Sequence, residues 1–65
     1  MDTARAAELQ VLLEGVPLPA DKAQLLEYAV RRRAEPQFIA ALRSLPAREY
    51  ATLDEVGVAL VEQGS

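Results

Sequence analysis

Apolar residues recur every three or four positions in four stretches of the chain, which is the period of an amphipathic helix. The predicted helices span residues 3–14, 21–34, 36–45 and 52–63. Gly15 and Pro17 end the first stretch, because glycine suits a left-handed cap and proline cannot continue a helix. Pro36 separates the second stretch from the third, and Pro46 ends the third. No stretch alternates as a strand would, so we expect an all-α fold, a compact bundle of four short helices.

Capping residues stand at the predicted helix starts. Caps are expected at Asp2 or Thr3, at Asp21 and at Thr52. Gln24 and Glu55 follow the last two caps by three residues, the spacing of a capping box. The local signals for helix starts therefore agree with the apolar period.

The inward positions of the four helices define a predicted core. This core comprises Leu9, Leu12, Leu13, Leu18, Leu25, Leu26, Ala29, Phe38, Ile39, Leu42, Leu45, Val56 and Leu60. Val30 is placed on the same buried stripe as Leu25, and Leu18 is expected to enter the core from a proline-flanked loop. Tyr50 is expected as a buried ring in the connector 47–51, with a recognition tyrosine as the alternative. Gly57, inside the fourth helix, predicts a close approach by another helix or by Tyr50.

Sixty-five residues form one domain at most, here residues 1–65, and 51% hydrophobic residues argue against disorder. The chain has no cysteine and no histidine, so it offers no disulfide and no thiolate or imidazole ligand. We therefore expect no metal and no cofactor. With 26% charged residues and no long apolar run, no membrane span is expected. Acidic residues among the first fifteen break any signal-peptide segment, so a cytoplasmic location is expected.

Paired carboxylates are the remaining candidate catalytic groups. Asp54 and Glu55 are adjacent and point about 100° apart on a helix, so they do not converge on one site. The glycines, Gly15, Gly57 and Gly64, form no phosphate-binding loop. The chain is therefore not expected to be an enzyme or to bind a small-molecule ligand. Gly64 and Ser65 are expected to form a frayed end.

Charge is unevenly distributed along the chain. Seven basic and ten acidic residues give a net charge of −3, yet residues 22–48 are basic and both ends are acidic. One explanation is complementarity between packed helices, and the other is a patch that binds a partner. The strongest basic feature is the triplet Arg31, Arg32 and Arg33. It is either a solvated helix end or an acidic-partner site extended by Arg43 or Arg48.

Three linked segments carry a resemblance to a known family. They are Pro19-Ala20-Asp21-Lys22 with Leu25, Leu26, Tyr28 and Ala29; Ala34 with Leu42, Leu45 and Pro46; and Arg48-Glu49-Tyr50 with Asp54, Glu55, Val56 and Ala59. On these residues the run from Leu12 to Leu60 resembles a small, mostly bacterial family of uncharacterised domains. Members often have Thr at the position of Asp21 and Gly directly before the alanine at Ala34. The resemblance implies a compact helical domain and assigns no catalytic or binding residues.

Two functions remain open. The leading hypothesis is a non-catalytic protein-interaction module that binds a protein partner or forms a homo-oligomer, because so small a core gains stability from association. Val11, Val58 and Val61 lie off the main apolar faces and could build the interface; a monomer with scattered surface valines is the alternative. The other function is a nucleic-acid-binding, helix-turn-helix-like domain that uses the basic middle of the chain. The third helix offers few polar side chains and the ends are acidic, so nucleic acid is not the favoured partner.

Overall fold

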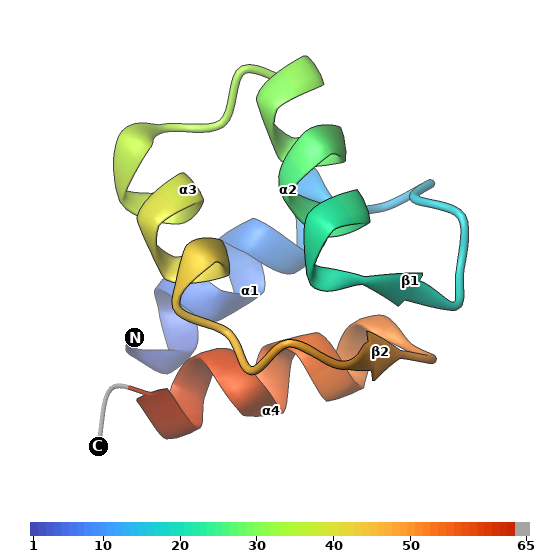
Figure 1. The fold of residues 1–65 in the computed structure, drawn as a ribbon. Coiled ribbons are helices and arrows are strands. Elements are labelled where there is room, and N and C mark those ends of the chain that lie inside the picture. The colour runs from blue at the N-terminus through green and yellow to red at the C-terminus, as the bar shows by residue number, and fades with distance from the viewer. Residues whose placement is uncertain (64–65) are drawn as a thin grey trace.

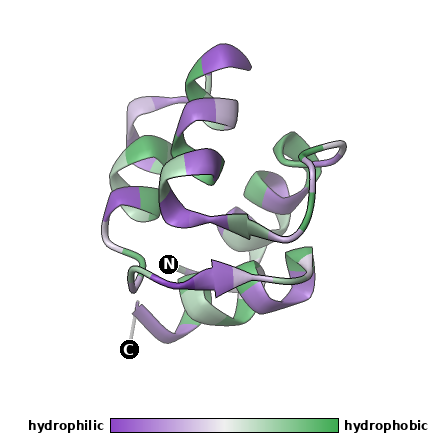
Figure 2. Cartoon of the chain, turned by 45° about the vertical axis from the view of Figure 1, so that its right-hand side comes forward, coloured by the Kyte–Doolittle hydropathy of each residue, from purple (hydrophilic) through white to green (hydrophobic). Residues whose placement is uncertain are grey.

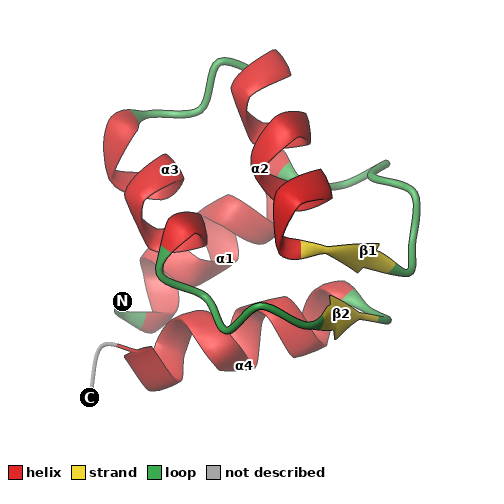
Figure 3. Cartoon of the chain, viewed as in Figure 1, coloured by secondary structure: helices red, strands yellow, loops and turns green. Residues whose placement is uncertain are grey.

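Four helices and two very short strands make up residues 1–63 of the computed structural model, the part of the chain that it describes (Figures 1 and 3). The elements are α1 (Thr3–Leu12), β1 (Ala20–Asp21), α2 (Lys22–Arg31), α3 (Pro36–Arg43), β2 (Glu49–Tyr50) and α4 (Leu53–Gln63). All four predicted helices are confirmed, each with a shorter span or a slightly later start. Gly64 and Ser65, expected as a frayed end, lie outside the described residues.

The first and last helices pack side by side and run antiparallel. The amino group of Met1 donates to the carbonyl oxygen of Leu60 over 3.2 Å, and Gln10 Nε2 donates to the carbonyl oxygen of Leu53 over 2.9 Å. Helices α2 and α3 pack against each other above this pair, and their connection lies at the end of the molecule opposite α4 (Figure 1). Each helix carries both hydrophilic and hydrophobic residues (Figure 2), as the amphipathic pattern predicted.

Two of the predicted caps are formed at the starts of α1 and α2. The Asp2 carboxylate accepts a hydrogen bond from the backbone N–H of Arg5 over 2.8 Å. Asp21 accepts from the N–H of Gln24, whose side chain accepts in return from the N–H of Asp21. Both caps satisfy backbone donors that the helix itself leaves free, which explains why the helices begin where they do.

The capping box at the start of α4 is also formed. Thr52 Oγ1 accepts from the N–H of Glu55 over 3.2 Å, and Glu55 Oε2 accepts from the N–H groups of Ala51 and Thr52. The Glu55 carboxylate thus has a structural role at this helix start.

Replacing Thr52 by alanine is expected to lower the free energy of unfolding by about 1 kcal/mol, because the N–H of Glu55 loses its partner. In a domain of this size such a loss lowers Tm by about 4–8 °C in a thermal melt followed by circular dichroism. Thr52→Ser keeps the hydroxyl and is the control. An alanine variant that melts together with the wild type would contradict the assigned cap.

The turn after α1 contains a glycine with positive φ, as the sequence indicated, although α1 itself already ends at Leu12. Gly15 has a φ of +94°, a region that side-chain-bearing residues rarely adopt. A Cβ atom at Gly15 would lie 3.0 Å from the hydroxyl oxygen of Tyr28, and that hydroxyl donates to the carbonyl oxygen of Glu14 over 2.8 Å. Tyr28 therefore ties the end of α1 to the middle of α2.

The expectation of no strand was wrong in one detail. Ala20 pairs with Tyr50 and Asp21 pairs with Glu49 in an antiparallel ladder of two residues per strand. Two residues are too few to show the alternation that marks a strand in a sequence. The ladder joins the segment before α2 to the segment before α4.

Tyr50 is the largest fully buried side chain of residues 1–63. Its hydroxyl donates to the carbonyl oxygen of Pro46 over 2.8 Å, and its ring is completely covered. The buried ring is confirmed, although Tyr50 lies in β2 and not in an irregular connector. The polar tip is satisfied within the chain, so the recognition-tyrosine alternative receives no geometric support.

Most of the predicted core is buried, with two corrections. The buried apolar residues are Ala6, Leu9, Leu13, Val16, Ala20, Leu25, Ala29, Phe38, Leu42, Leu45, Tyr50, Val56, Ala59 and Leu60. Leu18 is 40% exposed, because the chain bends at Leu18 and Pro19 and directs Val16 and Ala20 inward instead. Val30 is 61% exposed, because the buried stripe of α2 is narrow and ends at Ala29. Three further predicted core residues, Leu12, Leu26 and Ile39, are partly buried against the core.

Gly57 meets another helix closely, as its position predicted. A Cβ atom there would lie 2.2 Å from Gln10 Nε2 and 2.8 Å from Gln10 Cδ. The amide of Gln10 thus lies across the glycine and reaches the carbonyl oxygen of Leu53. The α1–α4 contact is therefore closed by a polar side chain that the apolar pattern did not single out.

Candidate functional site

The C-terminal end of α2 gathers the basic triplet on the surface. Arg31 Nη2 donates to Glu27 Oε1 over 2.6 Å, one helical turn away, and both side chains are exposed. The guanidinium of Arg32 lies over the ring of Tyr28, 5.7 Å from its centroid. Exposed pairs of this kind contribute about 0–1 kcal/mol to stability. Two of the three arginines are therefore partly engaged by neighbours on their own helix.

Arg33 differs from the other two because it ends the helix in a left-handed conformation. Its φ is 58°, and it is the non-glycine residue with positive φ among residues 1–63. Its N–H donates to the carbonyl oxygen of Val30, and the N–H of Ala34 donates to that of Ala29, each over 3.0 Å. These two hydrogen bonds form a Schellman motif, in which glycine usually occupies the position of Arg33.

This geometry corrects the predicted end of the second helix. The helix was expected to continue to residue 34, with three consecutive helical arginines, but α2 ends at Arg31 and Arg33 lies outside it. A sequence signal existed in the family resemblance, where glycine often precedes the alanine at Ala34. The left-handed conformation costs arginine about 1 kcal/mol more conformational free energy than it costs glycine. An arginine at position 33 therefore gave no reason to predict a helix end there.

We call Val30, Arg31, Arg32 and Arg33 the basic corner. Val30 is an exposed apolar residue between the buried stripe of α2 and the arginines. Among residues 1–63, no carboxylate lies within ion-pair distance of Arg32 or Arg33. The corner therefore presents an exposed valine and two arginines that form no ion pair within residues 1–63.

The other two basic candidates, Arg43 and Arg48, do not extend this corner. Arg43 is the last residue of α3, at the end remote from the α2–α3 connection. Arg48 precedes β2 and lies over the ring of Tyr50, 4.7 Å from its centroid. Arg48 and Lys22 both border a shallow groove of about 480 Å³. Lys22 begins α2 and Arg31 ends it, so the groove lies about 15 Å from the corner by the rise of a ten-residue helix. Of the five predicted residues, Arg31, Arg32 and Arg33 thus lie together, whereas Arg43 and Arg48 lie elsewhere on the surface.

A second surface feature runs between α1 and α4. This groove of about 520 Å³ is lined by Thr3, Ala6, Ala7, Gln10, Asp54, Gly57, Val58, Val61 and Glu62. Val58 is 57% exposed and Val61 is 37% exposed, which confirms that these valines lie off the main core. We call this feature the valine groove. Its charged lining residues, Asp54 and Glu62, are both acidic.

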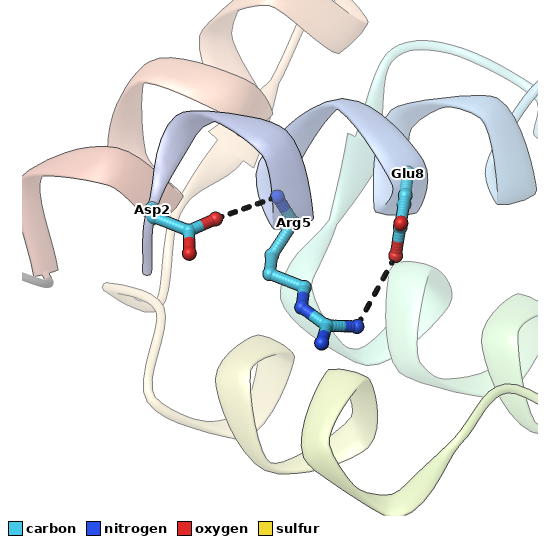
Figure 4. Close-up of polar contacts among 3 residues, drawn as sticks. All are labelled: Asp2, Arg5 and Glu8. Carbon is cyan, nitrogen blue, oxygen red and sulfur yellow. Dashed lines mark hydrogen bonds and ion pairs between the residues drawn. The ribbon is translucent and has the colours of Figure 1, made fainter.

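The cation nearest in sequence to the groove is engaged elsewhere. Arg5 Nη1 lies 3.5 Å from Glu8 Oε2 on the surface of α1, next to the Asp2 cap (Figure 4). Arg5 is not among the groove-lining residues. The acidic character of the groove is therefore not offset by a lining cation.

Carboxylates in the described part of the chain are dispersed. Glu55 serves the capping box, while Asp54 borders the valine groove. Within residues 1–63, no group of three or more acidic side chains is arranged to hold a metal ion. None of the helices described is long and apolar enough to cross a membrane.

A small all-α domain with a two-residue ladder and a charged helix end is the class of structure that these observations define. Residues 4–57 match the family model described as a protein of unknown function, DUF2795. The match covers most of the chain, so the protein belongs to this family, and the resemblance noted in the sequence is confirmed. No curated protein and no solved structure matches the chain.

Proposed function

We propose that the protein is a non-catalytic interaction domain whose basic corner binds an acidic surface of a partner protein. The observation that carries this proposal is Arg33. The chain places a cation at a left-handed position that glycine would occupy at lower conformational cost. Residues that oppose a local preference without a structural gain mark functional sites more often than ordinary surface positions do.

The surroundings of Arg33 fit a contact with an acidic protein. The exposed Val30 adds apolar area beside the two arginines, and arginine is the basic residue most enriched at protein interfaces. Arg31 is held by Glu27, so the contact would use mainly Arg32 and Arg33. Bidentate contact with partner carboxylates would then supply orientation as well as attraction.

The non-catalytic part of the proposal rests on the carboxylates. A general acid needs an apolar pocket that raises its pKa, and Glu55 instead binds backbone N–H groups at an exposed helix start. The two grooves described above are open and shallow. Lys22 and Arg48 line the first together with its acids, and the two acids of the valine groove are two helical turns apart on α4.

Binding to duplex DNA is the competing reading, and α3 gives it little support. A recognition helix presents polar side chains to the groove. The exposed positions of α3 include Gln37, Ala40 and Arg43. The hydroxyl of Ser44 donates a hydrogen bond to the carbonyl oxygen of Ala40. The basic corner precedes α3 and does not lie along it.

Replacing Arg33 by glycine separates folding from binding. We expect the variant to be more stable by about 1 kcal/mol, because the left-handed strain is removed, and to show a higher Tm by circular dichroism. We expect the same variant to lose partner proteins that the wild type captures from an extract of the native cells. Arg33→Lys is the control. It keeps both the charge and the backbone strain, so it should retain the captured proteins.

Two results would count against this function. One is a stabilised Arg33→Gly variant that captures the same proteins as the wild type. The other is tight binding of the wild type to a labelled 20-base-pair duplex, with a steep salt dependence that Arg33→Gly reduces, which would favour the nucleic-acid reading.

A further inference from the structure

We propose that a partner of the basic corner is the valine groove of a second copy of this chain. This inference rests on the proposed function and names a partner for the same corner. The contact would be head to tail: the corner between α2 and α3 of one copy would lie on the α1–α4 face of the next.

The groove has the chemistry that the corner requires. Asp54, Val58 and Glu62 follow one another at intervals of four residues, so they form one row on the outer side of α4. The row is about 12 Å long and places an exposed valine between two carboxylates. No lysine or arginine is found among the lining residues.

The basic corner is the complement of this row. Its exposed apolar residue, Val30, lies next to Arg33, whose N–H is bonded to the Val30 carbonyl oxygen. Laid on the groove, Val30 would contact Val58 or Val61, and the guanidinium groups of Arg32 and Arg33 would reach the flanking carboxylates. Valine would thus meet valine, and each arginine would meet an acid that no described cation neutralises.

Charge also argues against a two-fold symmetric contact through either surface. Two antiparallel α4 helices related by a two-fold axis through Val58 would bring Asp54 of one copy near Glu62 of the other. Two corners facing each other would bring arginine against arginine. The head-to-tail arrangement is the one of the three that pairs opposite charges.

The positions of the two surfaces determine how many copies the contact can join. The α2–α3 connection and α4 lie at opposite ends of the molecule in both ribbon views (Figures 1 and 2). A copy bound at one end leaves its other end free, so the contact propagates beyond a dimer, into an open chain or a closed ring. A stable interface buries about 800 Å² per partner, about a fifth of the 4055 Å² surface of this small domain. Nine residues line the groove, fewer than the about 20–30 per side of a stable interface, so association is expected to be weak and to decrease with salt.

The experiment measures self-association of the wild type by sedimentation velocity at concentrations up to about 1 mM, at low and high salt. We expect species that grow with concentration beyond the dimer and shrink with salt. Arg33→Glu in the corner and Glu62→Arg in the groove should each weaken association at least about tenfold. The double variant, which swaps the two charges, should recover it.

The control is Arg43→Glu, which changes the net charge as Arg33→Glu does, at an exposed helix end outside both surfaces. It should leave self-association unchanged. Circular dichroism checks the folding of each variant, and Arg33→Gly with Glu62→Gln provides a neutral pair if a charge reversal unfolds the chain.

A wild type that stays monomeric at low salt overturns the head-to-tail contact. So does self-association that neither Arg33→Glu nor Glu62→Arg weakens, or a closed dimer that does not grow. A monomeric wild type whose capture of other proteins still depends on Arg33 would overturn this contact alone and leave the proposed function standing.

Discussion

Replacing Phe38 by alanine is expected to destabilise the protein by about 3–5 kcal/mol, the largest effect of any substitution considered. Phe38 is the one phenylalanine of the chain and is buried in α3 among the leucines of the core. Truncation removes the transfer free energy of the ring and leaves a cavity that four short helices can fill only in part. A core of this size supplies a total stability of about 3–5 kcal/mol.

The measurement is urea denaturation followed by circular dichroism at 222 nm. The wild type should show a cooperative transition, whereas the Phe38→Ala variant should be largely unfolded without denaturant. Gln37→Ala, at the neighbouring exposed position, should remain close to the wild type. A folded Phe38→Ala variant with an unchanged midpoint would contradict the assigned core.

Replacing Tyr50 by alanine is expected to have an effect of similar size, about 3–5 kcal/mol, for a different combination of reasons. The substitution removes the largest fully buried side chain and one of the two hydrogen-bond donors to the carbonyl oxygen of Pro46, the other being the N–H of Arg48. It also removes the ring over which Arg48 lies. The loss should disturb the ladder between β1 and β2, since Tyr50 pairs with Ala20.

Tyr50→Phe divides this effect into its parts. Phenylalanine keeps the buried ring and loses only the hydroxyl, so the expected cost is about 0.5–1.5 kcal/mol. Urea titrations of the two variants measure both values. Equal destabilisation by phenylalanine and alanine would show that the hydrogen bond to Pro46, and not the ring, holds this part of the fold.

The sequence predicted helix starts better than helix ends, because the two depend on different signals. Asp21 and Thr52 act through side chains that bond backbone groups three residues away, so their role can be recognised locally. The end of α2 depends on the backbone of Arg33, and arginine is not a residue whose presence indicates a left-handed turn. The predicted helix was therefore three residues too long.

Burial was predicted where a helix has a wide apolar face and missed where tertiary packing decides. Leu25 and Ala29 follow the expected stripe, whereas Val30, which is also apolar, lies outside it and is exposed. The burial of Leu18 was predicted wrongly for a related reason, because the bends at Leu18 and Pro19 decide which residue enters the core. A pattern of hydrophobicity does not contain these relations between distant elements.

The candidate site was predicted only in part. The sequence identified the arginine triplet and the exposed valines Val58 and Val61. It did not indicate that Val30 joins the arginines or that Arg48 lies at the other end of α2, because both facts depend on how α2 packs. The structure confirms the fold class and the family match confirms the resemblance, while the partner has to be measured.

The contact between α1 and α4 has a consequence for the speed of folding. Its hydrogen bonds join residues 43 and 59 positions apart, nearly the full length of the chain. Small helical bundles fold within microseconds to milliseconds because most of their contacts are local, and each long-range closure adds to the barrier. Here α1 cannot pack against α4 until α4 has formed. A ribosome synthesising this chain therefore holds α1 without its partner until the residues of α4 have been added.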